Sequence, residues 1–112
     1  MTERHNQCAE ILYRIYKDWD VTKLPRSIRM KLWAVFVNRV KAAAHQSVNL
    51  RHFVYKLTDM LEIHTLSDPT LLDLLTNDDE CLSLLREEAK LIVLMVRQKL
   101  HDEKEGRQHA KT

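Results

Sequence analysis

The sequence predicts an all-α domain, a compact bundle of about five helices around one core. The chain has 112 residues, enough for a single domain of ordinary size. Its one glycine and two prolines are too few for the turns of an all-β fold or for a glycine-rich nucleotide loop. Hydrophobic residues make up 45% and charged residues 30% of the chain, which is typical of a globular protein, and the hydrophobic residues recur at helical spacing.

The first helix is expected from about Thr2, whose side chain can cap it, to about Trp19. Its buried face is indicated by residues at helical spacing, namely Cys8, Leu12, Ile15 and Trp19. Residues 20–25 read as a connection, because Pro25 has no N–H and suits the first turn of a second helix, predicted to run to Ala44. Apolar residues cover more than half of the circumference of this second helix, so we expect it at the centre of the bundle.

The remaining helices are placed by their starting signals. Ser47 or Asn49 can cap a third helix that ends near His64. Residues 67–69, Ser-Asp-Pro, combine a capping side chain with a proline at the first helical position and predict a short fourth helix. Polar residues 77–79 end it, and their acids favour the start of a fifth helix that continues to Leu100.

We assign residues 1–101 to one helical bundle domain and residues 102–112 to a charged, flexible C-terminal tail. The tail sequence DEKEGRQHAKT has no apolar periodicity and contains the only glycine of the chain. No internal repeat separates further units.

The charges of this chain are sorted along the sequence. Residues 21–57 contain eight basic residues and no Asp or Glu, and residues 58–80 contain seven acidic residues and no Lys or Arg. We call these the basic segment and the acidic segment. A basic segment interspersed with histidine and aromatic residues is typical of proteins that bind phosphate backbones. The predicted nucleic-acid contacts are Lys23, Arg26, Arg29, Lys31, Lys41, Arg51 and Lys56.

Two other interpretations fit the same charge pattern. The segments can pair with each other inside one molecule, as modest surface ion pairs. Alternatively, the basic face of one copy can contact the acidic face of the next, in a head-to-tail array. The eighth basic residue, Arg39, stands apart, because its helical projection falls within the apolar arc. It is expected either to form a structural ion pair with Asp59 or Glu62 or to belong to an interface.

The sequence carries no motif of a catalytic or metal site. Six histidines include no i, i+4 pair, and His5-x-x-Cys8 is a single weak ligand-like spacing. Trp19 and Trp33 can stack on bases, although their apolar neighbours favour the core. We therefore expect no enzyme activity, cofactor or small-molecule substrate. The N-terminus lacks a signal-peptide core, the two cysteines are far apart, and no apolar run reaches membrane length, which favours a cytoplasmic protein without membrane contact.

Two stretches carry a resemblance to a known family. The basic helix PRSIRMKLWAVFVNRVKAAA and the closing helix ECLSLLREEAKLIVLMVRQKL, with the helices between them, resemble the small subunits of CRISPR effector complexes over roughly residues 3–101. The resemblance is one of architecture and rests on no diagnostic motif. It implies a non-catalytic subunit of antiviral defense, present in several copies, that holds a guide–target duplex or a displaced strand through its Lys and Arg residues.

The sequence thus leads to two hypotheses of different classes. The first is a non-enzymatic helical subunit of a larger nucleoprotein complex, which binds the nucleic-acid backbone non-specifically. The second is a protein–protein adaptor or inhibitor that binds an acidic protein surface and no nucleic acid. Salt-dependent binding to arbitrary DNA or RNA separates them.

Overall fold

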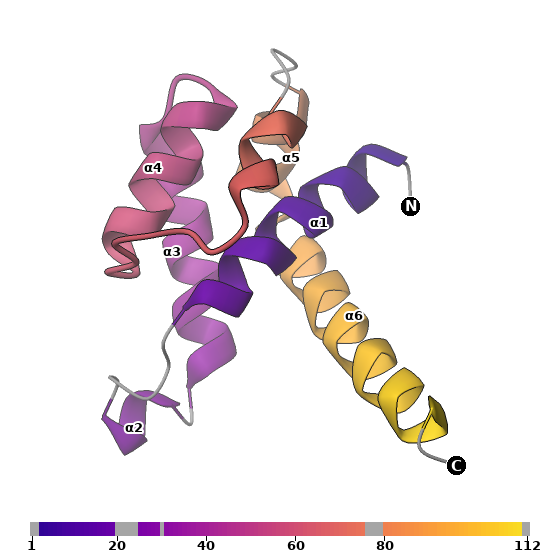
Figure 1. Ribbon diagram of the computed structural model, residues 1–112. Coiled ribbons are helices and arrows are strands. Elements are labelled where there is room, and N and C mark those ends of the chain that lie inside the picture. The colour runs from indigo at the N-terminus through magenta and orange to yellow at the C-terminus, as the bar shows by residue number, and fades with distance from the viewer. Residues whose placement is uncertain (1–2, 20–24, 30, 76–79, 111–112) are drawn as a thin grey trace.

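The computed structural model describes residues 3–19, 25–29, 31–75 and 80–110, with side chains for all of these except Arg29 and residues 106–110. The fold is all-α, as predicted, and these ranges contain no strand (Figure 1). The elements are α1 (Glu3–Asp18), α2 (Arg26–Arg29), α3 (Leu32–Gln46), α4 (Leu50–Met60), the 3-10 helix η2 (Pro69–Leu74), α5 (Glu80–Glu87) and α6 (Ala89–Ala110).

Helix α1 runs through the middle of the bundle and packs against α5, α6 and η2 (Figure 1). Its predicted buried stripe is confirmed, since Cys8, Leu12, Ile15 and Trp19 are all buried. The same face also buries Ile11. The i, i+3, i+4 spacing of these residues keeps them on one side of the helix, and burying that side is what stabilises α1.

The predicted second helix is two helices rather than one. We expected a continuous helix from Pro25 to Ala44, but α2 ends at Arg29 and α3 begins at Leu32. The backbone of Lys31, at the N-cap position of α3, has φ −107° and ψ 23°, outside the helical range. The side chains of α2 therefore do not continue the register of α3. As expected of a central helix, α3 packs against α4, α5 and α6.

Helix α4 is bounded by two recognisable caps. At its start, the side chain of Asn49 accepts a hydrogen bond of 2.8 Å from the backbone N–H of His52, which confirms one of the two predicted caps. At its end, Glu62 adopts a left-handed φ of 59°, and the backbone N–H of Ile63 donates to the carbonyl of Thr58 at 2.8 Å. This is the Schellman arrangement, in which glycine usually occupies the position of Glu62.

The segment after α4 is tied to α1. Asp68 caps η2 by accepting from the N–H of Thr70 at 3.0 Å, with Pro69 at the first position as predicted, although the element is a 3-10 helix. Arg14 donates to Asp68 and to the hydroxyl of Thr70, both at 2.8 Å. The side chain of Asp18 accepts from the backbone and the hydroxyl of Ser67. These contacts hold η2 along one side of α1.

The predicted fifth helix bends at Glu88, where α5 ends and α6 begins. The hydrogen-bond ladder continues through the bend, because the N–H of Glu88 donates to the carbonyl of Leu84 at 2.7 Å. Helix α6 then extends past the predicted end of the fifth helix, near Leu100, as far as Ala110, so that helix is longer than expected. The first part of this extension packs back on α1, since the hydroxyl of Tyr13 donates to Glu103.

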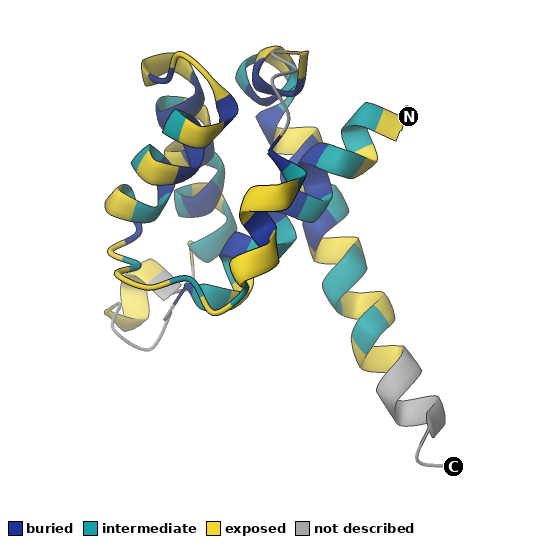
Figure 2. Ribbon diagram, turned by 45° about the horizontal axis from the view of Figure 1, so that its top comes forward, coloured by how far each residue is buried: buried dark blue, intermediate teal, exposed yellow. Residues whose placement is uncertain are grey.

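The core gathers side chains from every long helix (Figure 2). The largest fully buried side chains are Ile11, Leu12, Ile15, Phe36, Val40, Leu50, Phe53, Leu57, Leu71, Leu85, Ile92 and Val93. The second half of α6 extends beyond this core, and its described residues are exposed or half-buried. Among the described residues, no helix has an apolar stretch of the length that crosses a bilayer.

Candidate functional site

The described part of the basic segment lies on α2, α3 and α4 and the connections between them. Arg26 is in α2, Lys31 precedes α3, Lys41 is in α3, and Arg51 and Lys56 are in α4. All are exposed except Lys56, which is half-buried. Two of the predicted contacts cannot be placed in this way: Lys23 lies outside the described residues, and only the backbone of Arg29 is described, in α2.

No side chain of the basic segment takes part in an ion pair within the described ranges. The ion pairs there are all made by cations of α1 and α6: Arg4–Glu80 (2.6 Å), His5–Glu88 (2.8 Å), Arg14–Glu10 (3.0 Å), Arg14–Asp68 (2.8 Å), Lys17–Glu103 (4.0 Å), Lys99–Glu10 (3.0 Å) and His101–Glu105 (3.1 Å). The cations of α2, α3 and α4 whose side chains are described therefore have no carboxylate paired with them in this part of the chain.

The acidic segment pairs with α1 instead. Asp68 meets Arg14, and Glu80 meets Arg4, so two of its carboxylates are neutralised by cations that precede the basic segment in the sequence. Hydrogen bonds from Thr70, together with Arg14, lower the pKa of Asp68 against the opposing effect of desolvation. The described residues therefore do not show the basic and acidic segments pairing with each other inside one molecule, which was one of the interpretations of the charge pattern.

Arg39 is exposed, so the expectation of a buried side chain in a structural ion pair is wrong, while its assignment to an interface stays a prediction. The core-facing side of α3 is defined by Phe36, Val40, Ala43 and Ala44, and Arg39 projects about a quarter-turn away from their mean direction. The expected arc had included Ile28, which belongs to α2 and does not share the register of α3. Neither Asp59 nor Glu62 pairs with Arg39, and both of these acids are exposed.

The basic side chains of α3 do not form a single stripe. Arg39 and Lys41 are two residues apart, so they project about 160° from each other around the helix. Lys41 shares the outward side of α3 with Ala34, Asn38 and His45, which are exposed as well. The positive charge is therefore spread over the outer surface of the α2–α4 half of the bundle.

The chain matches no protein-family model, no curated protein and no solved structure.

The two tryptophans belong to an aromatic cluster. Trp19 is buried and stacks on Phe36 with 5.5 Å between ring centroids, so it is not available to a base. Trp33 is half-buried, and Tyr16 covers one face of its indole at 5.1 Å and an interplanar angle of 7°. Arg97 lies 5.8 Å from the centroid of the same indole. The interpretation of Trp19 as a core residue is confirmed. Trp33 packs against the core with one face and is half-buried.

The pair His5 and Cys8 has partners other than a metal. His5 Nε2 lies 2.8 Å from a carboxylate oxygen of Glu88, and the thiol of Cys8 donates to the carbonyl of Cys81 at 3.6 Å. The described residues contain no cluster of three or more His, Cys, Asp or Glu side chains with the geometry to hold a metal ion. Burial, reinforced by the neighbouring Cys81, raises the pKa of the Cys8 thiol far above its ordinary value.

The sequence did not predict two contacts that α5 makes with other helices. One is the contact between Cys8 and Cys81, which are 73 residues apart in sequence and lie together where α1 meets α5. The other is the role of Arg86, whose guanidinium donates to the carbonyls of Ala44 at 2.8 Å and Ser47 at 2.7 Å. Neither has a local sequence signal, because each depends on how α5 docks.

Proposed function

We propose that this chain is a non-enzymatic subunit of a larger, cytoplasmic nucleoprotein complex and binds the nucleic-acid backbone through the cations of α2, α3 and α4. The observation that carries the proposal is the absence of any ion pair to Arg26, Lys31, Lys41, Arg51 or Lys56 within the described residues, while Arg4, Arg14 and Lys17 of α1 and Lys99 of α6 are matched with carboxylates. Unopposed surface cations gain most from phosphate, because each contact releases condensed counterions.

The contacts proposed are to phosphate and not to bases. Of the aromatic side chains of the basic segment, Phe36 and Phe53 are buried, Trp33 is half-buried against Tyr16, and Tyr55 on α4 is exposed. Phosphate contacts position a protein on nucleic acid without reading its sequence. The resemblance to CRISPR effector small subunits, with a role in antiviral defense and several copies per complex, is a narrower form of the same proposal.

The test is a titration of fluorescein-labelled 30-nucleotide single-stranded RNA, single-stranded DNA and duplex DNA, followed by anisotropy between about 50 and 300 mM NaCl. The proposal expects binding to arbitrary sequences, with a log–log slope against salt of about −0.9 per phosphate contacted on duplex and about −0.7 on single strands. No binding at about 50 mM salt contradicts it and favours an adaptor that grips an acidic protein surface.

A matched pair of double variants separates local contacts from net charge. R26E/R51E reverses two unpaired cations of the basic segment, and K90E/K104E reverses two exposed cations of α6. Both change the net charge by the same amount. The first should weaken binding by about tenfold to a hundredfold and reduce the salt slope by about 1.4 to 1.8, and the second should have a much smaller effect. Equal effects of the two would contradict the assignment of the surface.

A further inference from the structure

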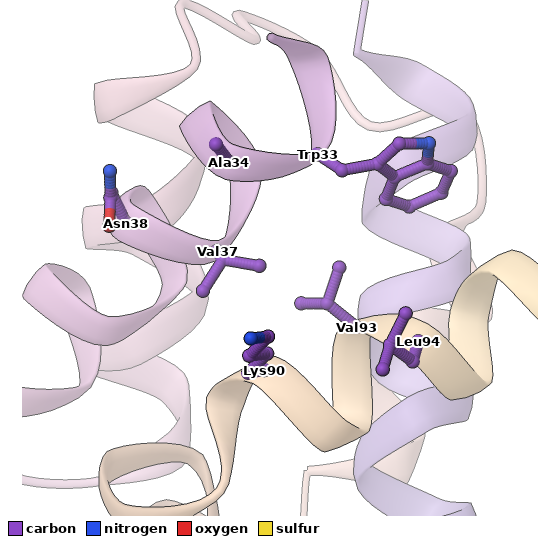
Figure 3. Close-up of a pocket in the computed structure, with 7 residues that line it drawn as sticks. All are labelled: Trp33, Ala34, Val37, Asn38, Lys90, Val93 and Leu94. Carbon is purple, nitrogen blue, oxygen red and sulfur yellow. The ribbon is translucent and has the colours of Figure 1, made fainter.

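Helices α3 and α6 leave an open groove between them (Figure 3), and no residue of α4 lines it. Its volume is about 320 Å³, and it is lined by Trp33, Ala34, Val37, Asn38, Lys90, Val93 and Leu94. Val37 and Val93 point toward each other across the floor, and the indole of Trp33 closes one end. The lining is therefore almost wholly apolar.

One wall of this groove is an exposed apolar ridge on α6. Leu94 is 51% exposed and Leu91 is 37% exposed. On the far side of the ridge lies a second groove of about 440 Å³, which Leu91 and Leu94 share with Met95 and with polar residues. A single exposed leucine is ordinary. Two leucines that border adjoining grooves form a continuous apolar surface of the kind that marks contact with another protein.

The charges at the two ends of the α3–α6 groove have the same sign. Lys90 lines one end, next to Val37, and Arg97 lies over Trp33 at the other. Lys90 and Arg97 are seven residues apart on α6, about 10 Å along its axis. Neither has an ion pair within the described residues, and no carboxylate lines this groove. The second groove, in contrast, contains Asp102.

We propose that the α3–α6 groove binds an amphipathic helix of a partner protein, with large aliphatic side chains seated between Val37 and Leu94 and carboxylates facing Lys90 and Arg97. Because those cations are about two helical turns apart, the partner helix carries acids at i and i+7 and apolar anchors at i+3 and i+4. The apolar floor favours a protein over nucleic acid, and the cations select an acidic one. This contact does not depend on the proposed nucleic-acid surface.

The probe is a synthetic helical peptide of 15 residues, blocked at both ends and built on an Ala/Gln host, with Glu at positions 4 and 11 and Leu at positions 7 and 8. Two matched peptides replace both Glu by Lys or both Leu by Ala. Binding is followed by ¹⁵N–¹H chemical shifts and by the fluorescence of Trp33. We expect the Glu peptide to perturb amides around Val37 and Val93, the Lys peptide to bind about tenfold more weakly, and the Ala peptide not to bind measurably.

Substitutions in the protein sharpen the test. K90E should abolish the preference between the Glu and Lys peptides, because Arg97 then remains as one cation opposite one new carboxylate, and the double variant K90E/R97E should reverse it. L94A should weaken both peptides without altering the preference. Both residues are exposed, so the fold is expected to survive, which the helical circular dichroism spectrum checks. R51E, on α4 and outside the groove, should leave peptide affinity unchanged while it weakens nucleic-acid binding, so the two proposals can fail separately.

Three results would overturn the inference. Equal affinity for the Glu and Lys peptides would show that the groove does not select an acidic partner. Chemical-shift changes that map outside the groove would show that the peptide binds elsewhere. Shifts of the groove resonances with protein concentration alone, abolished by L94A, would show that a second copy of this chain occupies the groove in place of a different protein.

Discussion

Replacement of Arg86 by leucine is expected to lower the free energy of unfolding by about 2–4 kcal/mol. The guanidinium bonds two carbonyls at the C-terminal end of α3, those of Ala44 at 2.8 Å and Ser47 at 2.7 Å. Helix ends leave such carbonyls without intrahelical partners. A hydrogen bond from a charged donor contributes about 1.5–3 kcal/mol, and Arg86 is only half-buried, so the lower part of that range applies to each bond.

The measurement is urea unfolding at 25 °C followed by circular dichroism. For a domain of this size a loss of about 3 kcal/mol corresponds to a fall in Tm of about 10–15 °C. R97L is the matched control, because it removes an exposed arginine whose recorded contact is the face of Trp33, and it should cost less than about 1 kcal/mol. R86K should recover only part of the loss, since one ammonium does not reproduce the guanidinium fork. A loss below about 0.5 kcal/mol for R86L would refute the reasoning.

Three further outcomes follow from local features. Because burial raises the pKa of the Cys8 thiol, Ellman's reagent should modify it only when urea unfolds the chain, and rapid modification in native buffer would contradict this. Glu10 is desolvated, but hydrogen bonds from an arginine and a lysine hold its pKa below 4.5. Its stabilising effect is therefore present above about pH 4.5 and lost as the pH falls through the lower folded value, so E10Q should flatten the acid side of a stability–pH curve. Glu62 has φ 59°, so E62G should raise the unfolding free energy by about 0.5–1 kcal/mol in urea titrations, and a decrease would show that its side chain matters more than its backbone.

Features governed by near neighbours in sequence were predictable. Each cap depends on residues close together in sequence. Asn49 accepts a hydrogen bond from the backbone N–H three residues later, and Asp68 accepts one from the backbone N–H two residues later. The buried stripe of α1 follows from helical periodicity alone. These elements appear in the structure within a few residues of their expected bounds.

Features that depend on distant parts of the chain were not predictable. The bend at Glu88 has no glycine or proline to announce it, and the side chain of Glu88 meets His5 on α1. Residues 102–105 look like a tail because they lack apolar periodicity, yet Glu103 accepts a hydrogen bond from Tyr13 and lies 4.0 Å from Lys17. A polar segment can thus be held helical by polar contacts with another helix, which an apolar pattern does not report.

The two candidate binding surfaces also differ in how far the sequence predicts them. The sorting of charge along the chain is visible by counting, but whether each cation is matched depends on which helix lies opposite. The exposure of Arg39 likewise depends on which side of α3 packs on its neighbours. The α3–α6 groove is less visible still, because Trp33 and Leu94 are brought together from elements 61 residues apart in sequence. Each of its residues, taken alone, looks like part of an ordinary amphipathic helix.

Helix α1 explains how the acidic segment can be partly neutralised without drawing on the cations of the basic segment. It lies between η2 and α6, and its cations reach in both directions: Arg4 and Arg14 take carboxylates of the acidic segment, and Lys17 approaches Glu103 on α6. Because these acids already have partners, they offer little attraction to the cations of α3 and α4. The R14Q variant, which removes one positive charge outside the basic segment, should therefore loosen η2 from α1 but leave the basic surface, and any polyanion binding that it supports, intact.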